Sequence, residues 1–135
     1  MPANRSAIGL RHATLAVAVT LSGLVVTRPA AADDAVAAAP ALYEVEFENA
    51  TVRVLRVVYG PGDKSPMHDH PDSVAVYLTG GRIRITLPDG QAGEPQVPPG
   101  LSMWHPAGRH AVENLGDAPF EMVLIELKQP AGPAR

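Results

Sequence analysis

The chain has 135 residues, no cysteine and five histidines, and its formal net charge is −3 at pH 7. This length accommodates one domain, and the lack of cysteine excludes disulfides, thiolate nucleophiles and thiolate metal ligands. The acidic balance argues against a nucleic-acid partner.

The N-terminus has the order of a secretory signal peptide. Arg5 and Arg11 precede an uncharged, mostly apolar run at residues 13–26, and small residues follow, which predicts cleavage after Ala32. The apolar run is shorter than the roughly 20 residues that span a bilayer. We therefore expect a periplasmic or secreted protein that keeps no membrane span after residues 1–32 are removed. A retained membrane anchor is the alternative.

The next segment, residues 33–41 (DDAVAAAPA), shows no strand periodicity and is predicted to be a flexible linker. Residues 42–128 then contain short runs of β-branched and apolar residues, separated by Gly, Pro and Asp. Seven or so strands with turn signals at roughly 8 to 12-residue spacing are typical of a sandwich or barrel. The sequence therefore predicts an all-β domain at 42–128, followed by a C-terminal tail at 129–135.

Individual runs within this domain have clear patterns. Residues 82–87 (RIRITL) alternate, which places Ile83, Ile85 and Leu87 on the inward face. A turn is expected at residues 88–90 (PDG). Residues 91–100 are rich in Pro and Gly and are predicted to form a loop between two halves, 60–90 and 100–128. Residues 120–127 are apolar at both parities, which indicates a strand covered on both sides.

Histidines supply the candidate chemistry. His68 and His70 are two residues apart, so on a strand their side chains share one face at a separation of about 6.5 Å. Two buried imidazoles side by side have no obvious role unless something binds them. A single histidine, in contrast, is usually a satisfied polar group or a surface residue. His105 and His110 also fall at the edges of predicted strands.

Two blocks around these histidines form a recognisable pattern. The first is GDKSPMHDHPDSVAVYLTGG, at residues 62–81, and the second is GLSMWHPAGRHAVEN, at residues 100–114. Together they resemble the two short motifs of the cupin superfamily, over about residues 42–128. The resemblance implies a small antiparallel β-barrel of the cupin type, a double-stranded β-helix or jelly roll, with a divalent metal ion inside.

The resemblance places metal ligands at His68, His70 and His110. The glutamate of the family pattern would fall at Val74 or Ala75, or at Ser73 if the strand is registered from Gly80, and none of these residues is acidic. The gap before the last histidine is also one residue shorter than in the family. A neutral set of three imidazoles suits Zn, Cu, Ni or Fe better than Mg or Ca, and the identity of the ion, Mn included, stays open.

Other side chains have more than one interpretation. His105 is a fourth ligand or a residue that supports the ligands from behind, and Tyr77 and Ser73, which share a strand face, either orient a substrate or pack in the core. Asn114 is predicted to cap backbone groups at a turn. Core positions are predicted at Met103, Trp104, Phe120 and Met122, and solvated positions at Asp69 and Asp72.

The sequence thus predicts an exported cupin barrel that holds one divalent transition metal ion and takes a small molecule. Three functions stay open: a metal-dependent dioxygenase or related small-molecule enzyme, a non-catalytic module for metal or a small ligand, and a metal-free structural barrel. The pattern names no substrate and leaves open whether the chain forms a homodimer.

Overall fold

The computed structural model describes residues 33–128, so the predicted signal peptide and the C-terminal tail lie outside the described residues. Within this range, one short helix, α1 (Ala35–Ala38), precedes the strands. The strands are β1 (Tyr43–Glu48), β2 (Val52–Tyr59), β3 (His68–His70), β4 (Ser73–Tyr77), β5 (Gly81–Thr86), β6 (Ala92–Gly93), β7 (Gln96–Val97), β8 (Ser102–His105), β9 (Gly108–Asn114) and β10 (Phe120–Leu127). Among the described residues, no helix has the length and apolar character needed to cross a membrane.

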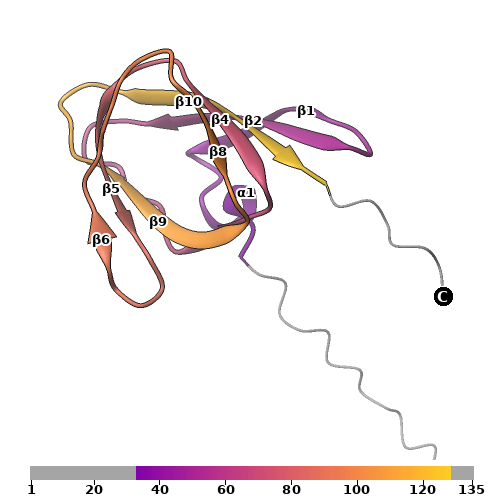
Figure 1. The fold of residues 1–135 in the computed structure, drawn as a ribbon, viewed down its shortest axis with the longest axis horizontal. Helices are drawn as coiled ribbons and strands as arrows, with labels where there is room; N and C mark the ends of the chain where they lie inside the picture. Colours follow the sequence, from indigo (N-terminus) through magenta and orange to yellow (C-terminus); the bar gives the residue numbers. More distant parts are fainter. Residues whose placement is uncertain (1–32, 129–135) are drawn as a thin grey trace, which may run out of the picture.

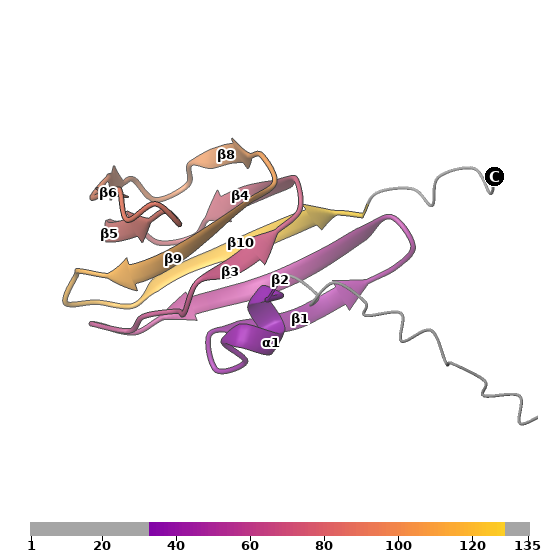
Figure 2. The same ribbon diagram turned by 90° about the horizontal axis from the view of Figure 1, so that it is seen from below.

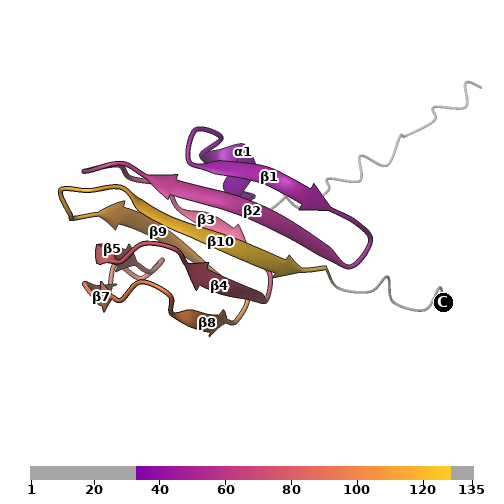
Figure 3. The same ribbon diagram turned by 90° about the horizontal axis from the view of Figure 1, so that it is seen from above.

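The strands form two antiparallel sheets. One has the order β1-β2-β10-β4-β8, and the other has the order β3-β9-β5-β6, with β7 also paired to β5. Figures 1 and 2 show the sheets curving around a common interior, and Figure 3 shows β9 and β3 behind β10 and β2. Both predicted halves contribute to both sheets, because β10 lies between β2 and β4 while β9 lies between β3 and β5. The predicted all-β barrel of the jelly-roll type is confirmed.

Alternating side chains build the core. In β5, Ile83 is buried while the adjacent Arg82 is exposed, as expected for a half-buried strand. The predicted turn after β5 also forms: the backbone N–H of Gly90 donates to the carbonyl of Leu87 at 2.9 Å, and Gly90 has a φ of 84°. A side chain is disfavoured at that φ, so glycine suits this position.

The predicted linker at 33–41 is not a simple linker. It contains α1, whose Ala35 is fully buried in the core. The Asp34 side chain accepts a hydrogen bond from the backbone N–H of Val36 at 3.0 Å and so caps the helix. The backbone N–H of Asp69, on β3, donates to the carbonyl of Asp33 at 2.9 Å. Tertiary contacts therefore fix a segment that has no strand periodicity of its own.

Two further predictions were wrong in part. The loop predicted at 91–100 contains β6 and β7, which pair with β5 as two-residue strands. Met103 and Trp104, predicted to be in the core, are 45% and 53% exposed, because β8 is the edge strand of its sheet. Phe120 is buried as predicted, whereas Met122 is only partly buried against the core.

The strand β10 is central in its sheet, but its two faces differ. Phe120, Leu124 and Glu126 are buried, while the alternate positions from Glu121 to Leu127 are half-buried. The prediction that both faces are covered therefore holds for one face, apart from the partly buried Met122, and for the other face in part.

Candidate metal centre

Pairing of β3 with β9 brings the three predicted ligand histidines together. His68 lies directly opposite His110 in the antiparallel register, and His70 lies opposite Gly108. One ligand nitrogen from each imidazole can be chosen so that all three lie within 4.8 Å of one another. His68 is fully buried and His70 is 8% exposed. The His-x-His spacing on a strand and one strand pairing thus assemble the cluster.

Hydrogen bonds define which nitrogen of His68 and His70 carries the proton. His68 Nδ1 lies 2.8 Å from the carbonyl oxygen of Pro66, and His70 Nδ1 lies 2.7 Å from Glu126 Oε1. Both partners are acceptors, so each Nδ1 is the protonated nitrogen. In the neutral imidazoles each Nε2 is then an acceptor, and His68 Nε2 lies 3.0 Å from the hydroxyl of Tyr43. The two Nε2 atoms nevertheless lie 3.0 Å apart, too close for two acceptors that share no donor.

A divalent ion fits this donor set. Two nitrogens that each lie about 2.1 Å from one ion, in directions at right angles, are about 3.0 Å apart. Holding Nδ1 with a carboxylate or a carbonyl, and leaving Nε2 free, is the usual arrangement around a metal-ligating histidine. The residues present therefore fit a transition metal ion held by His68, His70 and His110.

Glu126 is a functional residue that the sequence reasoning missed. It comes from β10, is 1% exposed, and accepts from His70 Nδ1 through one oxygen and from Arg53 Nε, at 2.6 Å, through the other. Arg53 also pairs with Asp34 at the start of α1. The signal was present, because Glu126 has the parity of Phe120 and Leu124 and so is an acid at an inward position.

Electrostatics keep this carboxylate ionised. Burial alone raises the pKa of Glu126, but the hydrogen bonds and charges of His70 and Arg53 outweigh burial, and its net pKa is lowered. An ionised Glu126 attracts the proton of His70 to Nδ1 and so keeps the Nε2 lone pair free for a metal ion.

Burial favours the neutral forms of His68, His105 and His110. Burial, followed by the positive charge that His70, His68 and His105 would carry, lowers the pKa of His110 to about 3. Burial is also the main cause that lowers the pKa of His68 and of His105. Neutral imidazole is the form that ligates a metal ion, so His68 and His110 are already in the binding form in the metal-free site.

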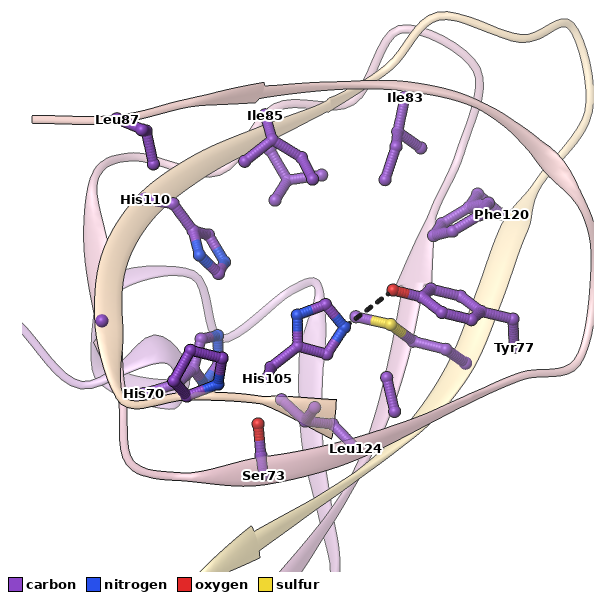
Figure 4. A pocket seen from close by; sticks show the side chains of 15 residues that line it. His70, Ser73, Tyr77, Ile83, Ile85, Leu87, His105, His110, Phe120 and Leu124 are labelled. Atoms are coloured by element: carbon purple, nitrogen blue, oxygen red, sulfur yellow. Dashed lines mark hydrogen bonds between the residues drawn. The ribbon is translucent and has the colours of Figure 1, made fainter. Parts of the chain in front are cut away.

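A cavity of about 230 Å³ opens beside the cluster. His70 and His110 line it, together with Ser73, Tyr77 and His105, and the rest of its wall is mostly apolar. Figure 4 shows His70 and His110 on the left, His105 nearer the centre, and Tyr77 and Phe120 on the right. The apolar wall residues are Ala75, Ile83, Ile85, Leu87, Pro106, Gly108, Val112, Phe120, Met122 and Leu124.

The side chain after the histidine pair that points inward is Ser73. It is 1% exposed and lines the cavity, whereas Val74 has the opposite parity and is only half-buried. Ser73 lies opposite Glu126 on one neighbouring strand and opposite His105 on the other. Ala75 is also buried and lines the cavity, so neither inward position considered for the glutamate of the family pattern, Ser73 or Ala75, is acidic.

His105 lies at the end of β8, away from the three-histidine cluster. Its Nε2 lies 3.0 Å from the hydroxyl of Tyr77, and both residues face the cavity (Figure 4). This contact ties one ring nitrogen of His105 to a phenol. Tyr77 and His105 thus form a polar pair in a largely apolar wall.

The remaining predicted residues have clear partners. Asp69 binds Arg109 at 2.7 Å, so it is an ion-pair residue rather than a freely solvated acid. Asp72 accepts from the backbone N–H of Ala107 at 2.7 Å. Asn114 is 1% exposed and donates to the carbonyls of Tyr59, Gly60 and Ala118, while its oxygen accepts from the N–H of Gly116. The prediction that Asn114 caps backbone groups is confirmed.

Comparison with known proteins identifies the family. The family model described as "Cupin domain" matches residues 55–126, which is more than half of the chain. The chain belongs to the cupin family. No curated protein matches this cupin.

Solved structures agree with this assignment. A cupin domain from Bordetella pertussis Tohama I is 32% identical, with a TM-score of 0.61, covering 65% of this chain and 93% of that one. A double-stranded β-helix protein from Klebsiella pneumoniae is 20% identical, with a TM-score of 0.55, covering 78% of this chain and 85% of that one. A cupin superfamily protein from Desulfitobacterium hafniense is 18% identical, with a TM-score of 0.50, covering 65% and 77% respectively. The last two likenesses concern the fold alone.

Proposed function

We propose that this cupin holds one divalent transition metal ion on His68, His70 and His110 and uses it on a small molecule in the adjacent cavity. The observation that carries the proposal is the pair of Nε2 acceptors 3.0 Å apart in a buried site, with both Nδ1 atoms already committed to acceptors. Two acceptor lone pairs that face each other at this distance in a buried site repel each other, and a shared cation replaces that repulsion with attraction to both. Iron, zinc, nickel, copper and manganese are the candidate ions.

The position of the cavity supports a reaction on a small molecule. His70 and His110 line the cavity, so a molecule bound there lies beside the ligand nitrogens. Bound Fe(II) would supply a Lewis-acidic, redox-active centre suited to oxygen chemistry. We propose that the protein is a metal-dependent dioxygenase of a small, largely apolar molecule.

The side chains of the chain itself would bind and orient that molecule. The apolar walls, among them Ile83 and Phe120, exclude water and bind hydrocarbon surface. The Tyr77 hydroxyl and His105 Nε2 share one hydrogen bond, so either can turn to a polar group of the molecule. Their place in the wall sets which end of the molecule faces the histidines.

A non-catalytic binding module is the second candidate. In residues 33–128 no carboxylate lines the cavity, which leaves Tyr77 and the histidines as its titratable groups. An enzyme with this wall would therefore depend on its metal ion and on the Tyr77–His105 pair for proton transfer. Loss of metal-dependent turnover with retained ligand binding would favour the module.

Metal analysis tests the proposal. The protein as purified from its own compartment is expected to hold about one metal ion per chain, and His70→Asn is expected to lower that content several-fold. The matched control is His105→Asn, which alters a cavity histidine outside the cluster and should retain the metal. Equal metal content in wild type and His70→Asn would contradict the site, and no metal in the wild type would favour a structural barrel.

We also propose that the protein is exported and cleaved after Ala32. Support comes from the basic, apolar and small-residue order of residues 5–32. Asp33, the N-terminus that cleavage would create, has contacts of its own: its carbonyl accepts from the backbone N–H of Asp69, and its side chain pairs with Arg109 at 3.1 Å. Cleavage there would remove none of these contacts. N-terminal sequencing of protein from the periplasmic fraction should begin at Asp33, and an intact Met1 in that fraction would contradict cleavage.

A further inference from the structure

The hydroxyl of Tyr43 lies within the candidate metal centre. Tyr43 begins β1 and is 2% exposed. Its hydroxyl oxygen lies 3.0 Å from His68 Nε2, the nitrogen that faces the other ligands. His68 Nε2 is therefore 3.0 Å from two different donor atoms, the phenol oxygen of Tyr43 and the Nε2 of His70. The Tyr43 oxygen, His68 Nε2 and His70 Nε2 are thus potential metal ligands, with the first and the last each at the spacing of an adjacent ligand from His68 Nε2.

Proton positions show why this contact matters. His68 Nδ1 carries the ring proton, since its partner is the carbonyl of Pro66, so in the metal-free protein the Tyr43 hydroxyl donates to His68 Nε2. A metal ion on His68 uses the same lone pair. The phenol then loses its acceptor at His68, while its oxygen stays next to the ion.

The surroundings of Tyr43 suit an oxygen ligand. The Tyr59 hydroxyl lies 2.6 Å from the Tyr43 hydroxyl and can donate a hydrogen bond to it. The two rings meet edge to face with centroids 6.0 Å apart, and the Tyr43 and His68 rings meet the same way at 5.2 Å. These contacts fix the Tyr43 ring, so its oxygen needs no large movement to reach an ion.

Tyr43 and His68 lie on the side of the cluster away from the cavity. Neither is among the residues that line it, whereas His70 and His110 are. An oxygen ligand at Tyr43 would therefore leave the cavity side of the ion open to a small molecule.

We propose that Tyr43 supplies the fourth protein ligand of the metal ion, an oxygen donor in place of the glutamate that β4 lacks. This inference rests on the proposed metal function. When the oxygen binds the ion, the phenolic O–H bond breaks, the oxygen keeps the electron pair, and the proton leaves to solvent. Tyr59 then donates its hydrogen bond to the Tyr43 oxygen.

Ferric iron provides a direct test, because a phenolate oxygen bound to Fe(III) gives a charge-transfer absorption band in the visible range. Chelator-treated protein is loaded with Fe(III) and, separately, with Zn(II). Wild type should bind Fe(III) at one ion per chain and show the band. Tyr43→Phe should lose the band and bind Fe(III) at least tenfold more weakly, since oxygen ligands suit Fe(III). Its affinity for Zn(II) should fall less, because the three imidazoles remain.

Tyr77→Phe is the matched control, since it removes the hydroxyl of another buried tyrosine, one that contacts His105 rather than a ligand histidine. This variant should keep the band and change the affinity for Fe(III) by less than about threefold. Circular dichroism and thermal melting of the metal-free proteins establish that both variants fold.

The outcomes separate this inference from the proposed function. Stoichiometric Fe(III) without a visible band, or an equal band and affinity in wild type and Tyr43→Phe, would overturn the role of Tyr43 and leave the three-histidine site in place. Failure of the wild type to bind either metal would overturn both. A misfolded Tyr43→Phe still leaves the wild-type band as the deciding result.

Discussion

Removing the charge of Glu126 is the perturbation with the largest expected effect per atom changed. Glu126→Gln keeps the shape of the side chain but replaces a carboxylate that is 1% exposed and accepts from both His70 and Arg53. An amide offers only one acceptor oxygen, so one of these two donors must face an NH₂ group. Asp34 still pairs with Arg53, so the substitution does not leave the Arg53 guanidinium without an acidic partner.

The magnitude follows from these contacts. A hydrogen bond to a charged group contributes about 1.5–3 kcal/mol, and breaking a buried ion pair costs about 3–5 kcal/mol. Arg53 has an 18% exposed side chain and a second partner, so the loss falls below the ion-pair range and within the range of the charged hydrogen bond. We expect Glu126→Gln to lower the free energy of unfolding by about 2–3 kcal/mol, and the melting temperature of a domain this size by about 10 °C or more. Metal affinity should fall about 10–100-fold, because Glu126 orients a ligand.

Glu121 provides the matched control on the same strand. It pairs with Arg56 at 3.0 Å, but its side chain is 36% exposed. Glu121→Gln should change the free energy of unfolding by less than about 1 kcal/mol and leave metal affinity unchanged. Urea denaturation and metal titration of both variants decide the matter. Equal stability and equal metal affinity in the two variants would refute the argument that Glu126 supports His70.

Three further expectations follow from the same structure. Burial and the neighbouring histidines lower the pKa of His110 to about 3, so as the pH falls below about 6.5 this histidine is protonated in the unfolded chain before it is protonated in the folded one. Metal-free protein should therefore lose about 2 kcal/mol of unfolding free energy between pH 7 and pH 5. Urea denaturation should show a smaller loss in His110→Gln. Ser73→Glu points into the cavity and should shift metal preference toward Mn or Fe in a competition with Zn, whereas Val74→Glu, on the other face, should bind metals in the wild-type order. Phe120→Ala should lower the free energy of unfolding, measured by calorimetry, by about 3–5 kcal/mol, while Trp104→Ala, at a 53% exposed position, should lower it far less. Similar decreases in the two variants would mean that β8 packs more tightly than its exposure indicates.

Much of the site could be predicted from the sequence because its signals are local. The His68 and His70 spacing gives a shared face on any strand, and the alternation around Ile83 gives the strand itself. Core predictions failed at Met103 and Trp104, since β8 lies at an edge of its sheet and leaves these two side chains partly uncovered. The sequence does not state that β8 is an edge strand, because that depends on the order of strands in the sheet.

The residues that the sequence did not reveal are those that support the ligands from a distance. Glu126 is 56 positions away from His70, and Tyr43 is 25 positions away from His68, so neither contact has a local spacing rule. Each contact follows from topology, because β10 and β1 belong to the sheet that faces the one carrying β3. The parity of Glu126 with Phe120 and Leu124 was nevertheless visible, and an acid at a core parity requires a buried partner. In a barrel of this kind, a carboxylate at an inward position of an otherwise apolar strand is therefore the sequence signal that should accompany a histidine pair elsewhere in the chain. The histidines supply the nitrogen lone pairs, and a carboxylate from the opposite sheet holds the ring proton on the other nitrogen.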